Sequence, residues 1–240
     1  MPTHFFNRTA YRLVPVPVPD CFLKLDALLG SLDGRPIQLL AAQSVRLAEL
    51  VCRRMADVDY WNYQMETVLR SRADPWQKSI AIGTMLNAYL GGTKSLLDAT
   101  AIVANELFAL ELRPKQTDFG KPVFWRALEA ASRQHYVSLA VHRPLFIDVI
   151  RWRDAAIHRS TPLVVVTLPG PPSRETLKAG TPKLSADPSR DVAHLAGLFP
   201  SPDNYQEWLE PLALCKRWRP AFVAVCAHVC TWLAGQRSGG

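Results

Sequence analysis

The chain has 240 residues, of which 48% are hydrophobic, and a formal net charge of +7. This length and composition allow a substantial buried core, so the sequence predicts a single domain over residues 1–240. No apolar run reaches the roughly 20 residues that span a bilayer, and the N-terminus lacks the apolar segment of a signal peptide. These observations predict a protein that has no membrane span and no signal peptide and lies in the cytoplasm.

Most of the 28 basic residues are arginine. The planar guanidinium group matches phosphate oxygens in a bidentate fashion, so the charge balance suits a polyanionic partner such as RNA. The alternative explanation is the codon bias of a GC-rich genome. The five cysteines show no metal-binding spacing, and Cys226 and Cys230 are predicted to be small apolar core residues on a helix.

The first 120 residues divide into an arm, a short helix and two long helices. Residues 1–20 form a proline-containing N-terminal arm, because Pro15, Pro17 and Pro19 favour an extended backbone. Helical periodicity then predicts helices over about 21–32, 36–72 and 75–112. The last of these begins at Asp74-Pro75, an N-cap carboxylate followed by proline, and ends before Arg113-Pro114.

The second long helix carries a polar stripe. At about 100° per residue, Asn87, Lys94, Asp98 and Asn105 project within about 20° of one line. The stripe either lines a cleft or a seam between helices, or is simply solvated, with Lys94 and Asp98 forming an i,i+4 pair.

The rest of the chain is also predicted to be mainly α, with one small β-hairpin before the last helix. Helices are expected over about 122–136, 144–158, 192–198 and 204–234, and Pro211 and Pro220 are candidate break points in the last of these. His135 and His142 are expected on the surface or in a loop. The β-branched run at 163–168 predicts a strand, and a partner within 175–184 completes the hairpin, which spans 163–184.

The helix over 144–158 ends in a charged stretch that is the main candidate site. Asp154 and His158 lie four residues apart on one helical face, so the carboxylate can bond the imidazole and fix its tautomer. Arg153 lies about 140° around the helix from His158. The alternative is an ordinary helix end, where basic side chains interact favourably with the helix dipole.

Two of these patterns resemble the HEPN superfamily of helical proteins, many of which are ribonucleases. One is the long-helix segment from Lys94 to Glu106. The other is Arg153-Asp154-Ala155-Ala156-Ile157-His158, which looks like the superfamily signature of an arginine, a polar residue and a histidine four to six residues later. The resemblance covers roughly residues 36–236. Ser160 stands where members paired with a nucleotidyltransferase antitoxin often carry a tyrosine.

The resemblance implies an antiparallel bundle of four to five main helices that forms a homodimer, with the motifs of both copies facing a shared basic cleft. It implies RNA cleavage without metal or other cofactor, by attack of the 2′-hydroxyl to leave a 2′,3′-cyclic phosphate, and a possible antitoxin or defence-complex partner. His158 would act as general base or acid, Arg153 would stabilise the transition state, and Asp154 would orient either His158 or the motif of the other subunit. The residues expected to contact substrate are Arg151, Arg159, Lys94, Asp98 and Asn105. The alternative function is a non-catalytic module that binds RNA, nucleotides or a helical partner.

Overall fold

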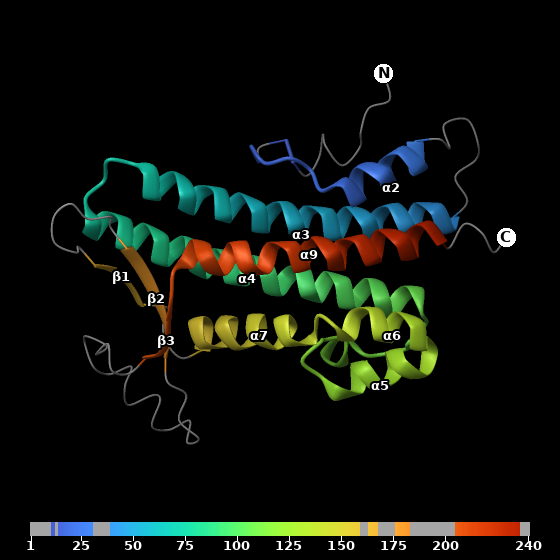
Figure 1. The fold of residues 1–240 in the computed structure, drawn as a ribbon. Helices are drawn as coiled ribbons and strands as arrows, with labels where there is room; N and C mark the ends of the chain where they lie inside the picture. The colour runs from blue at the N-terminus through green and yellow to red at the C-terminus, as the bar shows by residue number, and fades with distance from the viewer. Residues whose placement is uncertain are drawn as a thin grey trace. The chain divides into compact units, whose positions relative to one another are not determined.

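The computed structural model describes residues 11–12, 14–30, 39–158, 163–167, 176–182 and 205–235, and these are mainly helical, as predicted (Figure 1). The helices are α2 (Asp20–Gly30), α3 (Leu39–Arg70), α4 (Pro75–Leu107), the short 3-10 helix η1 (Pro114–Gln116), α5 (Pro122–Ala131), α6 (Arg133–Ala140), α7 (Arg143–His158) and α9 (Pro211–Gly235). Within the described ranges, every helix is too short or too polar to cross a membrane.

The chain forms two compact units, each assembled from separate stretches of sequence. Unit 1 comprises Met1–Tyr60, Gly92–Ile147 and Arg219–Gly240, and unit 2 comprises Trp61–Gly91 and Asp148–Trp218. The boundaries between them fall within α3, α4, α7 and α9. The Lys94 end of the predicted polar stripe therefore belongs to unit 1, and the charged end of α7 belongs to unit 2.

Helix α4 begins as predicted and ends earlier than predicted. The Asp74 carboxylate accepts hydrogen bonds from the backbone N–H groups of Trp76 and Gln77, at 2.9 and 3.0 Å, so it is the N-cap. The helix ends at Leu107 rather than Leu112, because the backbones of Ala109 and Glu111 are left-handed, with φ of 47° and 54°. This early stop creates the loop that lies beside the polar stripe.

The helix predicted over 122–136 is two helices, α5 and α6. Ser132 separates them with an extended backbone (φ −156°, ψ 99°), and its N–H donates to the carbonyl of Leu128 at 2.8 Å. The buried residues Phe124, Trp125 and Leu128 hold α5 in unit 1. The sequence predicted one helix here because the apolar spacing continues across Ser132.

The last helix begins at Pro211, not near residue 204 as predicted, because Tyr205–Leu209 forms strand β3. Strands β1 (Leu163–Thr167) and β2 (Thr176–Pro182) pair antiparallel, with Val165 opposite Lys178, and β3 pairs antiparallel with β2 (Figure 1). All three strands belong to unit 2. Pro220 lies inside α9 without ending it. The short helix predicted at 192–198 falls outside the described residues.

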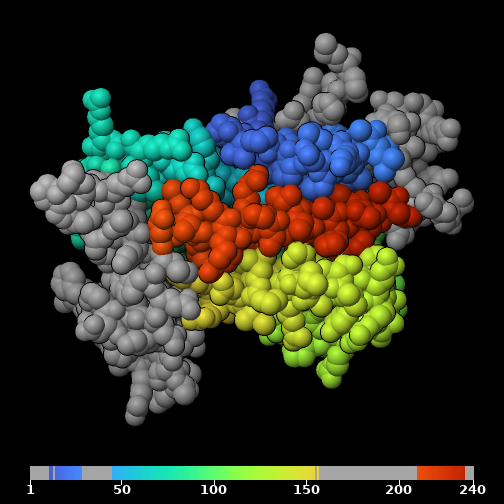
Figure 2. Space-filling view, viewed as in Figure 1, coloured from blue at the N-terminus to red at the C-terminus, as the bar shows by residue number. Residues whose placement is uncertain are grey.

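The core of unit 1 is formed by α2, α3 and α9 together with aromatic residues that follow α4 in the sequence. Phe22, Val51, Met55 and Phe222 are fully buried. Figure 2 shows the C-terminal part of α9 (red) between the blue helices α2 and α3 and the yellow-green helices α5 and α6. Of the predicted arm, residues 1–10 and 13 lie outside the described part of the chain, and residues 14–19 form neither helix nor strand.

The core of unit 2 contains residues of α4, α7 and α9. The rings of Tyr89 and Trp218 stack with their centroids 6.3 Å apart. The Asp148 carboxylate accepts from Arg217 Nη2 at 3.1 Å and from Trp218 Nε1 at 3.4 Å. Trp152 is fully buried on α7, so it fixes which side of this helix faces the interior.

Candidate functional site

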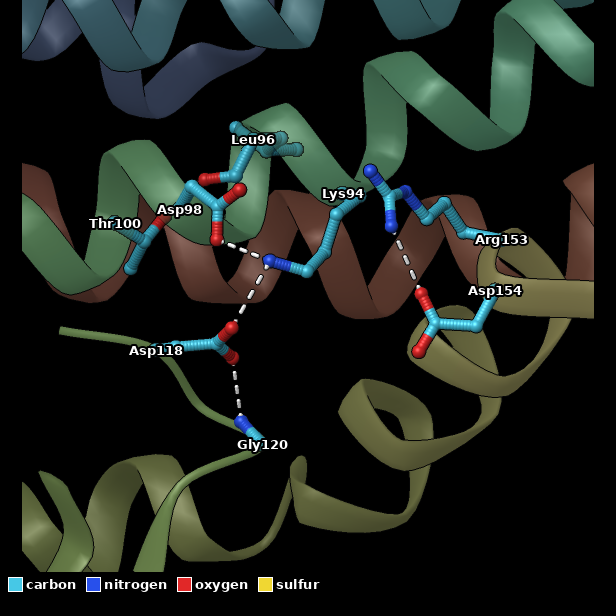
Figure 3. A network of polar contacts seen from close by, with 8 residues as sticks. All are labelled: Lys94, Leu96, Asp98, Thr100, Asp118, Gly120, Arg153 and Asp154. Carbon is cyan, nitrogen blue, oxygen red and sulfur yellow. Dashed lines mark hydrogen bonds and ion pairs between the residues drawn. The ribbon is translucent and has the colours of Figure 1, made fainter. Parts of the chain in front are cut away.

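The end of α7 presents a hydrogen-bonded pair of charged side chains. Arg153 Nη1 donates to Asp154 Oδ1 at 2.9 Å (Figure 3). The side chain of Arg153 is 30% exposed and that of Asp154 is 49% exposed. Such a pair contributes little to stability, because solvent screens it. The hydrogen bond does fix the direction of the guanidinium group.

The packing of α7 explains why these side chains face outward. Phe146, Val149, Trp152 and Ala156 are buried, at the three- and four-residue spacing of one helical face. Arg153 therefore projects from a different side of the helix, next to the fully buried Trp152. Arg151 is half-buried on the other side of Trp152.

The predicted pairing of Asp154 with His158 stays a prediction. His158 is the last residue of α7, but its side chain is outside the described part of the structure, and so is all of Arg159. The described partner of Asp154 is Arg153. The i,i+4 spacing predicted a bond between Asp154 and the histidine because such neighbours share a helical face. This spacing does not reveal the adjacent arginine, whose long side chain can fold back on the same carboxylate.

On α4, Lys94 bridges two carboxylates in unit 1. Its ammonium group pairs with Asp98 one turn along the helix and with Asp118 Oδ2 at 3.3 Å (Figure 3). The Lys94 side chain is only 13% exposed. Asp118 Oδ1 also accepts the backbone N–H of Gly120 at 2.7 Å. The predicted i,i+4 pair therefore exists, but it is part of a half-buried network rather than a solvated surface pair.

Asn105 fastens the loop after α4. Its Oδ1 accepts the backbone N–H of Leu112 at 3.0 Å, and its Nδ2 donates to the carbonyl of the same residue at 3.4 Å. Both the oxygen and the nitrogen of the side-chain amide are thus hydrogen-bonded to the backbone of Leu112. This geometry gives Asn105 a structural role, and the substrate contact expected from the sequence stays a prediction.

A cavity of about 610 Å³ lies beside α4 and the loop that follows it. It is lined by Lys94, Asp98, Ile102, Asn105, Glu106, Leu112, Pro114, Lys115, Thr117 and Asp118. Three of the residues expected to contact substrate, Lys94, Asp98 and Asn105, are in this lining, which contains three carboxylates and two lysines. Because a phosphate is attracted by net positive charge, this lining gives no support to RNA contact at Lys94.

Two polar residues of these networks were not found from the sequence. Asp118 is 24 positions from Lys94, and its only local signal is that of a turn, an aspartate two residues before a glycine. Asp59 is 1% exposed and accepts hydrogen bonds from Arg219, 160 positions away, at 2.7 Å from Nε and 3.1 Å from Nη2. Spacing along one helix carries no information about either partner.

His135 and His142 were expected on the surface or in a loop. His135 lies on α6 and His142 lies in the turn between α6 and α7, and both are half-buried in unit 1. The ring centroid of His135 lies 4.6 Å from that of Phe108, and the centroid of His142 lies 5.7 Å from that of His228. Burial lowers the pKa of all three histidines, because it penalises the charged imidazolium. These rings pack against aromatic neighbours and stand apart from the predicted motif in sequence.

Comparison with known proteins gives no relative for this chain. No family model, no curated protein and no solved structure matches it.

Proposed function

We propose that the chain is a HEPN-type endoribonuclease that cleaves RNA without a metal ion. The proposal includes an antiparallel helical bundle with a small hairpin before the last helix, a homodimer and a cytoplasmic location. It also includes a possible antitoxin or defence-complex partner that restrains the activity. The sequence supports it through the arginine–histidine spacing at the end of α7 and the net charge of +7.

The observation that carries the proposal is the Arg153–Asp154 pair. An arginine that binds a phosphorane in a transition state has to be aimed beforehand, because ordering it during the reaction costs free energy. The hydrogen bond from Arg153 Nη1 to Asp154 Oδ1 at 2.9 Å provides such an orientation. In this mechanism Asp154 positions the guanidinium, whether or not it also contacts His158.

The remaining roles follow from side-chain chemistry. An imidazole that titrates near neutral pH can take the proton from the 2′-hydroxyl or give one to the leaving 5′-oxygen, and His158 has that role here. Arg153 stabilises the charge that develops on the phosphorane. Arg151 and Arg159 bind neighbouring backbone phosphates. In the reaction the 2′-oxygen forms a bond to phosphorus while the bond to the 5′-oxygen breaks, which leaves a 2′,3′-cyclic phosphate.

The test is cleavage of a labelled single-stranded RNA in EDTA by the wild type, His158→Ala, Arg153→Ala and the control Arg126→Ala. Arg126 is an exposed arginine on α5, so its removal lowers the net charge equally without touching the motif. We expect cleavage by the wild type and the control, and a loss of at least about 100-fold for the two motif variants. His158→Ala removes general acid–base catalysis, and Arg153→Ala removes stabilisation of the charged transition state. An RNA with a 2′-deoxy nucleotide at the cleavage site should resist. Cleavage that persists in His158→Ala, or on the 2′-deoxy substrate, would refute this mechanism.

A non-catalytic binding module is the second candidate, and the network on α4 favours it. Lys94, Asp98 and Asn105 all have partners within the chain, so this face acts as a scaffold. Such a module would bind RNA in a salt-dependent way, more weakly in Arg153→Ala, and would leave the RNA intact at every protein concentration. Light scattering of the purified protein tests the homodimer for either candidate.

A further inference from the structure

The cavity beside α4 lies between two walls and contains none of the residues assigned to RNA cleavage. One wall is the side of α4 that carries Asp98, Ile102 and Glu106, and the other is the loop with η1, over residues 112–118. All of the lining belongs to unit 1, so the cavity lies within one compact unit. Its volume of about 610 Å³ is in the range of sites that hold small organic molecules.

The two walls are fastened to each other at two separate points. At the first point, the Lys94 ammonium group of α4 pairs with Asp118 Oδ2 of the loop at 3.3 Å (Figure 3). At the second point, the Asn105 side chain is hydrogen-bonded to the backbone of Leu112 at 3.0 and 3.4 Å. The cavity is therefore formed in advance, and a ligand that enters it does not have to order the loop.

The lining is negatively charged although the protein is basic. It contains three carboxylates and two lysines, which sum to −1, whereas the whole chain carries +7. Lys94 is only 13% exposed and shares its one positive charge between Asp98 and Asp118, so these three side chains also sum to −1 (Figure 3). Lys115 is exposed on η1, where its long side chain can keep its charge in water. The charge of the lining therefore favours a cation, even though the net charge of the chain repels one.

The α4 wall determines which shape of cation fits. Asp98, Ile102 and Glu106 follow one another at four-residue spacing, so their side chains leave the helix within about 80° of each other. The two carboxylate-bearing residues are about 12 Å apart along the helix axis. Ile102, which is 42% exposed, lies between them and offers an apolar surface. This order of acidic, apolar and acidic side chains matches a chain of methylene groups with an ammonium group at each end.

A metal ion matches the same lining less well. The described residues include the whole lining, and they contain no group of three His, Cys, Asp or Glu side chains that could hold a metal ion. Ammonium groups need no such convergence, because each can donate hydrogen bonds to a single carboxylate. The separation of Asp98 from Glu106 thus favours an organic cation.

We propose that this cavity binds a linear aliphatic diammonium or polyammonium ion. One ammonium group binds the Asp98 carboxylate, the methylene chain lies over Ile102, and the second ammonium group binds the Glu106 carboxylate. A carboxylate has two oxygens with about four lone-pair sites, so Asp98 can accept the ligand beside the Lys94 ammonium group. This binding does not depend on the proposed ribonuclease activity.

The experiment is isothermal titration calorimetry of the full-length protein, freed of nucleic acid, with matched ligands. The ions of 1,8-diaminooctane and 1,4-diaminobutane carry the same charge and differ in length, and 1,8-octanediol has the longer chain without the charge. We expect a single 1,8-diaminooctane ion to bind per chain, at least about fivefold more tightly than 1,4-diaminobutane, because only the longer ion can reach both carboxylates. The diol should not bind, and added salt should weaken the binding of the diamine.

Variants locate the site. Asp98→Asn and Glu106→Gln each remove one carboxylate charge at nearly constant side-chain size, and each should raise the Kd by at least about fivefold. Ile102→Lys places an ammonium group between the two carboxylates and should abolish binding. The matched control is Glu129→Gln on α5, which changes the net charge equally outside the lining and should leave the Kd unchanged.

The comparison of ligands on the wild type decides the proposal even where a variant does not fold. A lack of binding by 1,8-diaminooctane, equal affinities for the two diamines, or equally tight binding of the diol would each overturn it. A rise in Kd in Glu129→Gln as large as that in Glu106→Gln would mean that acidic side chains attract the diamine wherever they lie, and would overturn the assigned site. Because the readout is the heat of binding, failure here leaves the ribonuclease test unaffected, and the reverse also holds.

Discussion

Replacing Arg219 by methionine should destabilise the protein far more than an ordinary surface substitution. Asp59 is 1% exposed, and its carboxylate accepts two hydrogen bonds from Arg219 and one from Tyr11. Arg219→Met removes the only cation paired with Asp59 among the described residues and leaves the charge buried with the tyrosine hydroxyl. Breaking a buried pair in this way costs about 3–5 kcal/mol. Arg219 is 34% exposed, so water can reach the site, and we expect the lower end, about 3 kcal/mol.

The matched control is Arg217→Met, two residues earlier on the same helix. Arg217 pairs with Asp148 at 3.1 Å, but its side chain is 55% exposed, so its loss should cost less than about 1 kcal/mol. Tyr11→Phe removes a single hydrogen bond to the Asp59 carboxylate and should cost about 2 kcal/mol. Urea denaturation followed by circular dichroism gives the free energy of unfolding for each variant, provided the slope with denaturant is unchanged.

The order of these losses in free energy of unfolding shows whether burial of the ion pair decides its contribution. If Arg219→Met costs no more than Arg217→Met, the burial of Asp59 is not what makes the pair important, and the argument from desolvation fails. The double variant Tyr11→Phe with Arg219→Met adds a second check. Its loss should differ from the sum of the two single losses, because both residues act on one carboxylate.

Two further predictions concern unit 1. Asn105→Ala should lower the free energy of unfolding by about 1–2 kcal/mol, because it removes both hydrogen bonds to the Leu112 backbone. It should also speed hydrogen exchange of the Leu112 amide. Unchanged exchange would contradict the role assigned to Asn105. Burial lowers the pKa of His142 and of His228, and neighbouring imidazoles lower each further. The stability contributed by the neutral rings is therefore present above the unfolded-chain value of about 6.5 and is lost as the pH falls through the folded-state pKa. His228→Gln should flatten the fall in urea midpoint between about pH 6.5 and 5, and an unaltered slope would argue against it.

Local signals predicted several parts of the fold. An N-cap carboxylate followed by proline at Asp74-Pro75 gave the start of α4, because capping needs only the first turn. Apolar spacing gave α3 and α7 to within a few residues of their observed bounds. The early end of α4 was missed because left-handed residues such as Ala109 and Glu111 have no marker comparable to glycine.

Some features of the candidate site could likewise be predicted from the sequence, and others could not. The sequence by itself determined that α7 ends in Arg151, Arg153, Asp154 and His158, and that Lys94 and Asp98 share a helical face, since both follow from spacing along one helix. Only the tertiary structure decided that Asp118 joins Lys94 and that Asp59 pairs with Arg219. Contacts between segments far apart in the chain depend on how the buried faces of the helices pack, and a helical repeat specifies a face without specifying its partner.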